Sequence, residues 1–123
     1  MTGRKNLQQP HAVEQLEAED LRRFRADRET VTVGIADFAV SDSPDQVLAT
    51  YALGSCIGLS LYDPQAGIGG LIHCMLPLGR KEPEKSRKHP ARFVDTGVVL
   101  LLKKLLSRGC SKSNLIAKVA GGA

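Results

Sequence analysis

Cys56 and His73 are the two residues of this sequence best suited to nucleophilic chemistry. A cysteine attacks efficiently near neutral pH only when its proton is removed, and a neighbouring imidazole can remove it. Gly54 and Ser55 directly precede Cys56, so their backbone N–H groups could donate to an oxyanion that develops during attack. Thr50 lies a little upstream, and its hydroxyl could orient the imidazole or a substrate amide. Together these residues predict a thiol hydrolase that acts on an amide.

Two predicted strands would bring the thiol and the imidazole together. Residues 57–62 alternate between apolar and polar, residues 63–67 have turn chemistry, and residues 68–76 form the returning strand of a β-hairpin. If Tyr62 lies opposite Gly67, then Cys56 lies opposite His73 and Ile57 opposite Ile72. Opposed Cβ atoms are about 4.5–5.5 Å apart, within reach of a thiol–imidazole contact. The hydrophobic pattern favours this register, because a shift by one residue places His73 opposite the apolar Ile57.

Each cysteine and histidine also has an ordinary structural interpretation. A cysteine inside an apolar segment is usually a small core residue, and we assign Cys74 and Cys110 to the core. A zinc site is a weaker alternative, because there is no C-x-x-C pair and adjacent strand residues point to opposite faces. Its ligands would be Cys56, His73, Cys74 and His89. We expect His89 to be solvent-exposed instead.

The remaining pattern predicts an α+β fold, a mixed sheet or sandwich with flanking helices. Residues 31–35, 47–51 and 115–120 suit strands, the last of them buried, and residues 42–45 suit a turn. Residues 91–108 have helical apolar spacing and would pack on the sheet, with Gly109 as the C′ residue. Residues 1–30 carry balanced charges and only a thin apolar stripe, which predicts a frayed helix or a disordered extension. The folded domain would span residues 31–123.

Composition narrows the classes of function. The chain has 123 residues, which suits one domain, and its 42% hydrophobic and 4% aromatic content predicts an aliphatic core. Three cysteines, no signal peptide and no membrane span indicate reduced thiols in a cytoplasmic protein without membrane insertion. The net charge of +4 is concentrated in residues 80–92, within a predicted basic loop over residues 79–90. Nucleic-acid binding is a distant rival, because no aromatic residues are interleaved with these cations.

Several motifs in this order resemble the CheD family, the chemoreceptor glutamine deamidases of bacterial and archaeal chemotaxis. The resemblance covers about residues 31–123. The motifs are T-Y-A-L-G-S-C (residues 50–56), Y-D-P (62–64), G-G-L-I-H (69–73), M-L-P (75–77), F-V-D (93–95) and A-K-V-A-G-G-A (117–123).

The resemblance implies both a mechanism and partners. A Cys–His–Thr triad carries over onto Cys56, His73 and Thr50, and would hydrolyse the side-chain amide of selected glutamines in methyl-accepting chemoreceptors. The thiolate would attack the glutamine Cδ, ammonia would leave, and water would release the γ-glutamyl thioester as glutamate. The resemblance implies no metal or organic cofactor and no nucleic acid. It also implies binding to CheC-type phosphatases of the chemotaxis response regulator.

This chain departs from the family pattern after its last motif. Family chains continue past Gly-Gly-Ala with further strands, whereas this sequence ends at Ala123. We therefore expect a C-terminally truncated domain with an unpaired sheet edge. The alternative function is a catalytically impaired CheD-like binding module that engages chemoreceptors or a CheC-type phosphatase.

Overall fold

The computed structural model describes residues 22 and 26–123. The predicted N-terminal extension therefore lies largely outside the described residues. The strands are β1 (Glu29–Thr32), β2 (Asp37–Ser41), β3 (Gln46–Ala49), β4 (Ile57–Asp63), β5 (Ile68–Cys74) and β6 (Ile116–Gly121). The helices are α4 (Pro83–Lys88) and α5 (Val94–Ser107), with short 3-10 turns η1 (Gly79–Lys81), η2 (Pro90–Arg92) and η3 (Lys112–Asn114).

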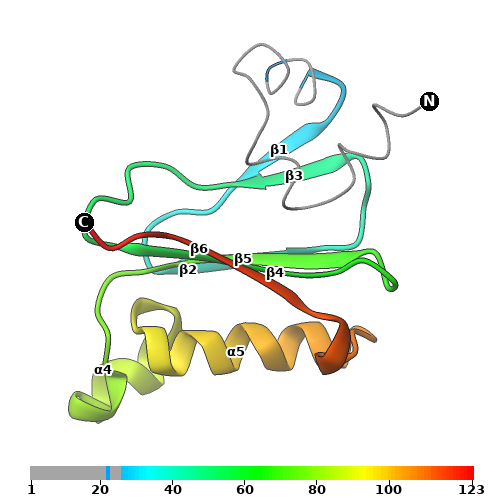
Figure 1. Ribbon diagram of the computed structural model, residues 1–123. Helices are drawn as coiled ribbons and strands as arrows, with labels where there is room; N and C mark the ends of the chain where they lie inside the picture. Colours follow the sequence, from blue (N-terminus) through cyan, green and yellow to red (C-terminus); the bar gives the residue numbers. More distant parts are fainter. Residues whose placement is uncertain (1–21, 23–25) are drawn as a thin grey trace.

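The described residues form three layers. Four strands make an antiparallel sheet in the order β2-β5-β4-β6, and β1 pairs with β3 in parallel as a second small sheet. Figure 1 shows the four-stranded sheet in the middle, with α5 on one face and the β1–β3 pair on the other. The predicted α+β fold with a helix packed on a sheet is therefore confirmed.

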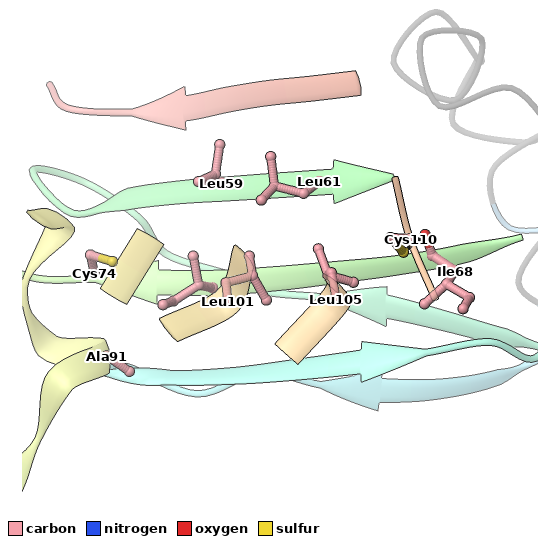
Figure 2. Packing of buried hydrophobic residues seen from close by; sticks show 9 residues of the cluster. Leu59, Leu61, Ile68, Cys74, Ala91, Leu101, Leu105 and Cys110 are labelled. Atoms are coloured by element: carbon pink, nitrogen blue, oxygen red, sulfur yellow. Dashed lines mark hydrogen bonds between the residues drawn. The ribbon is translucent and has the colours of Figure 1, made fainter. Parts of the chain in front are cut away.

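The core lies between α5 and the four-stranded sheet and is aliphatic. Leu59 and Leu61 of β4 face Leu101 and Leu105 of α5, and both helix residues are fully buried (Figure 2). Helix and sheet approach closely at Gly97, where an added Cβ would lie 2.9 Å from Cδ1 of Ile72. The absence of a side chain at this position is what lets α5 lie directly on β5.

Helix α5 begins three residues later than predicted and ends one residue earlier, at Ser107. Residues 90–92 form η2, and Phe93 then takes an extended conformation that buries its ring completely before the helix begins. The Asp95 carboxylate accepts hydrogen bonds from the N–H groups of Gly79 (2.7 Å) and Thr96 (2.8 Å), which ties η1 to the first helical turn. At the other end Gly109 has a φ of 106°, the left-handed conformation expected of the C′ residue.

The predicted basic loop over residues 79–90 is wrong as a secondary-structure assignment, because it contains η1 and α4. Pro83 occupies the first turn of α4, where its missing N–H leaves no helical hydrogen bond unmade. Ser86 is the one buried residue of α4, which is six residues long. A helix this short, with one buried residue, has no apolar periodicity by which the sequence could predict it.

The strand predictions need three corrections. Strand β2 was missed, β1 lies earlier than predicted at Glu29–Thr32, and β3 ends before Thr50. Strand β6 is not buried. Among the described strands it lies at the sheet edge with β4 as its one partner, and Val119 is 66% exposed. The apolar run of residues 115–120 is typical of a buried strand. Whether such a strand is buried depends on a second neighbouring strand or a covering helix, which the local sequence does not specify.

Candidate active site

The β4–β5 hairpin pairs Gly58 with His73 and Tyr62 with Gly69, two residues away from the predicted register. The turn has the predicted length but lies one residue later, over residues 64–67, because Asp63 pairs with Ile68 and organises it. Its Oδ1 accepts hydrogen bonds from the N–H groups of Gln65 (2.9 Å) and Ala66 (3.0 Å). Side chains alternate with a period of two, so a two-residue shift leaves each strand side chain on its predicted face. Cys56 is consequently diagonal to His73 rather than directly opposite.

His73 is buried and held by Thr50 on the sheet face opposite α5. The His73 side chain is 1% exposed, and its Nδ1 lies 2.8 Å from Thr50 Oγ1. The same hydroxyl donates to the Val33 carbonyl oxygen at 2.8 Å. Because a hydroxyl has one proton and a carbonyl can only accept, His73 Nδ1 must be the donor toward Thr50. In the neutral ring the other nitrogen, Nε2, then carries the lone pair.

That second nitrogen is poised to accept a proton. Nε2 of His73 is buried and has no hydrogen-bond partner among the described residues. Buried polar atoms without a partner are rare in native proteins, and functional sites are one of the places where they occur. A buried, unpaired lone pair on a neutral imidazole is the form required of a general base.

Cys56 lies in a tight turn just before β4. Its N–H donates to the Leu53 carbonyl at 2.7 Å, and the turn contains two left-handed residues, Ala52 (φ 55°) and Gly54 (φ 52°). An alanine in this conformation costs about 1–2 kcal/mol, so the turn is strained at Ala52. Cys56 is half-buried, and strained backbone of this kind is concentrated at functional sites.

The two predicted oxyanion donors remain available. The N–H groups of Gly54 and Ser55 donate to no acceptor within the described part of the chain, and both residues are exposed. The N–H of Cys56 itself is engaged by Leu53 and is therefore not a candidate.

The end of β6 holds this turn in place, a contact that the sequence did not predict. The N–H of Gly122 donates to the Cys56 carbonyl (2.9 Å), and that of Ala123 donates to the Gly54 carbonyl (3.0 Å). Gly121 has a φ of 94°, and a Cβ there would lie 2.1 Å from the Cys56 carbonyl oxygen. The paired glycines at the end of the A-K-V-A-G-G-A motif were the available signal, because consecutive glycines indicate close backbone approach.

The other two cysteines are buried in the core, as predicted. Cys74 is 1% exposed, and its burial, together with the negative charge of a Cys56 thiolate, raises the pKa of Cys74 to about 11. Cys110 is buried at the β5 side of the core, and burial also raises the pKa of its thiol. His89 is exposed, as expected. Within the described residues, no three His, Cys, Asp or Glu side chains are grouped so that they could hold a metal ion.

An open groove of about 300 Å³ lies on the same sheet face as His73, although neither His73 nor Cys56 lines it. It runs between β3 and the sheet, past Thr50 and Gly58, the residue paired with His73. The groove is lined by Leu48, Ala49, Thr50, Leu53, Gly58, Ser60, Leu71, Lys118, Val119 and Ala120. No described helix is long and apolar enough to cross a membrane.

Comparison with known proteins gives one consistent family. Residues 75–123 match the family described as CheD chemotactic sensory transduction. A protein of Solibacter usitatus named probable chemoreceptor glutamine deamidase CheD is 53% identical over 95 residues, which are 77% of this chain and 56% of that protein. A similarly named protein of Syntrophus aciditrophicus is 48% identical over 76% of this chain and 58% of that protein. Another from Pyrococcus abyssi is 46% identical over 76% of this chain and 55% of that protein. The chain thus spans little more than half the length of these relatives.

Proposed function

This chain belongs to the CheD family, and we propose that it converts selected glutamines of methyl-accepting chemoreceptors to glutamate. Cys56 is the nucleophile, His73 is its general base, and Thr50 orients the imidazole. The observation that carries the proposal is the unpartnered, buried Nε2 of His73, whose lone pair follows from the hydrogen bonds at Thr50.

The proposed reaction divides into two steps. His73 Nε2 takes the thiol proton of Cys56, and the thiolate attacks the glutamine Cδ to form a tetrahedral oxyanion. The N–H groups of Gly54 and Ser55 are free to donate to that oxyanion. The imidazolium then protonates the departing nitrogen, which leaves as ammonia, and a γ-glutamyl thioester remains. His73 next takes a proton from water, which hydrolyses the thioester to glutamate and restores the thiol.

Mass spectrometry of a chemoreceptor cytoplasmic fragment tests this function directly. Incubation with the protein should convert glutamines to glutamates, and the Cys56→Ala and His73→Gln variants should abolish the conversion. A Cys110→Ala variant is the matched control, because its thiol is buried in the core away from the proposed triad. Conversion that persists in a folded Cys56→Ala variant would contradict the assignment of the nucleophile.

A second candidate function is supported by the unpartnered Nε2 of His73, which makes no hydrogen bond with the Cys56 thiol in the structure. In this alternative the domain binds chemoreceptors or a CheC-type phosphatase without turning substrate over. The two functions are separated by comparing the parent protein with its Cys56→Ala variant. Partner binding that is equal in both, with no conversion by the parent, would favour the binding module.

A further inference from the structure

Four exposed apolar side chains adjoin the proposed triad, and we call them the apolar collar: Ile35 (61% exposed), Tyr51 (53%), Met75 (38%) and Leu76 (39%). Tyr51 directly follows Thr50, and Met75 and Leu76 follow the end of β5, which carries His73. Ile35 precedes Ala36, whose N–H donates to the His73 carbonyl at 2.9 Å. Exposed apolar side chains that gather around one site are typical of an interaction surface.

A cationic segment continues directly from the collar. The N–H groups of Met75 and Leu76 donate to the Arg92 carbonyl at 2.8 and 3.1 Å, so the two ends of residues 77–91 are held together beside the collar. That segment contains η1 and α4, and its exposed cations are Arg80, Lys81, Lys85, Arg87 and Lys88. In Figure 1, α4 lies at the same end of the molecule as the C-terminus, which is bonded to the Cys56 turn.

Much of this positive charge is not neutralised locally. Lys85 pairs with Glu82 at 3.1 Å, whereas Arg87 and Lys88 make no ion pair with a described residue. The exposed guanidinium and ammonium groups can therefore pair with carboxylates of another molecule.

We propose that the apolar collar and the cationic α4 segment together dock an acidic segment of the substrate protein, with apolar side chains beside its target glutamine. This proposal rests on the proposed function, because it assigns the surface that delivers glutamine to Cys56. The apolar side chains contact the collar, while the carboxylates face α4. A nucleic acid would use the same cations but would gain nothing from Met75 and Leu76, so the combination favours an acidic protein segment.

Binding can be measured without turnover, which keeps this test separate from the proposed function. All proteins carry Cys56→Ala, and a fluorescent peptide with one glutamine between glutamates and leucines is the probe. Two matched peptides replace the glutamates by lysines or the leucines by serines. The acidic, apolar peptide should bind by fluorescence anisotropy, and each replacement should weaken binding by about tenfold or more.

Paired variants locate the surface. Arg87→Glu with Lys88→Glu should weaken binding about tenfold at low salt, and the loss should shrink as salt rises, because exposed charges are screened. Met75→Ser with Leu76→Ser should weaken it about tenfold at all salt concentrations. The controls are Lys103→Glu with Lys104→Glu and Val99→Ser with Leu106→Ser, which alter exposed residues of α5.

The result that overturns the proposal is equal binding of all three peptides, or equal weakening by the α5 controls. Tighter binding of a DNA duplex than of the acidic peptide, unaffected by Met75→Ser with Leu76→Ser, would also overturn it and assign the cations to nucleic acid. Docking that follows the expected pattern while the parent protein converts no receptor glutamine would contradict the deamidase function and leave the surface standing.

Discussion

Thr50 connects a backbone carbonyl to the imidazole that serves as the proposed base. Its single hydroxyl proton goes to Val33, so the histidine must donate from Nδ1 and keep its lone pair on Nε2. In the proposed mechanism Thr50 therefore acts through His73 as a positioning residue, and the Val33 carbonyl selects the tautomer. An inert residue of the same shape would leave the ring buried but free to adopt the other tautomer.

Replacing Thr50 by valine should slow alkylation of Cys56 by iodoacetamide by at least about tenfold, because the imidazole loses its tautomeric control. Mass spectrometry of the labelled peptides measures the rate at each cysteine separately. Thr50→Ser keeps the hydroxyl and should restore the rate, which a purely steric role of the residue would not explain. Equal rates in the valine and serine variants would contradict the positioning role.

The buried Cys74 thiol should make the stability of the protein depend on pH in the alkaline range. Burial raises its pKa from the ordinary 9.0 to about 11, so the folded protein keeps this proton where the unfolded chain has lost it. The contribution of this thiol to the free energy of unfolding is therefore fully present below pH 9. It is lost as pH rises toward 11, by at most about 1.4 kcal/mol per pH unit. Urea unfolding at pH 8, 9 and 10 should show this decline in the free energy of unfolding. The Cys74→Val variant should lack the part of the decline that the Cys74 thiol causes. Identical slopes in both proteins would contradict it.

At the scale of elements, the closest contact at the site is between β6 and the Cys56 turn. Gly121→Ala should destabilise the protein by about 2–4 kcal/mol, because a Cβ would collide with the Cys56 carbonyl and alanine disfavours a φ of 94°. It should also slow alkylation of Cys56, since the turn loses its support. Urea unfolding and labelling measure the two effects. Gly34→Ala is the control, because nothing lies within 4 Å of its added Cβ, and it should change neither quantity.

Sequence patterns predicted some elements well, and the failures have physical causes. The β4–β5 hairpin and α5 were predictable because seven-residue and 14-residue elements show clear periodicity. The register was wrong by two residues because it depends on how Asp63 caps the turn, which alternation cannot detect. The faces of β4 and β5 were nevertheless right. The predicted contact between the Cys56 thiol and the His73 imidazole stays a prediction, because Nε2 of His73 has no hydrogen-bond partner among the described residues. The hydrogen bonds between the end of β6 and the Cys56 turn were not predictable, because strand pairing between distant segments leaves no local pattern.

For the whole molecule, Asp63 links distant parts of the chain. Its Oδ1 caps the β4–β5 turn, while its Oδ2 accepts a hydrogen bond from the N–H of Ser111 at 2.9 Å, just before η3 and β6. Backbone N–H groups, that of Ala66 first and that of Ser111 next, lower the pKa of the Asp63 carboxyl below its ordinary 3.8. The carboxylate is thus favoured in the folded state over the unfolded one.

The stabilisation from Asp63 should be present above about pH 4 and lost as pH falls through its lowered pKa, because the unfolded chain binds the proton first. Urea unfolding between pH 2 and 7 should show a shallower acid decline for Asp63→Asn than for the parent protein. The variant should also be less stable at pH 7, since an amide holds the turn and Ser111 less well. Asp45→Asn, at an exposed residue, is the control and should leave the acid decline unchanged.

The contact between Gly122 and the Cys56 carbonyl has a consequence for the order of events during synthesis. A ribosome adds about 5–20 residues per second, so Cys56 leaves the exit tunnel several seconds before the glycines that secure its turn. During that interval the nascent chain carries the thiol without the two backbone hydrogen bonds that hold its turn. The turn of the proposed nucleophile therefore reaches its final form only after Gly122 and Ala123 have been added and have left the tunnel.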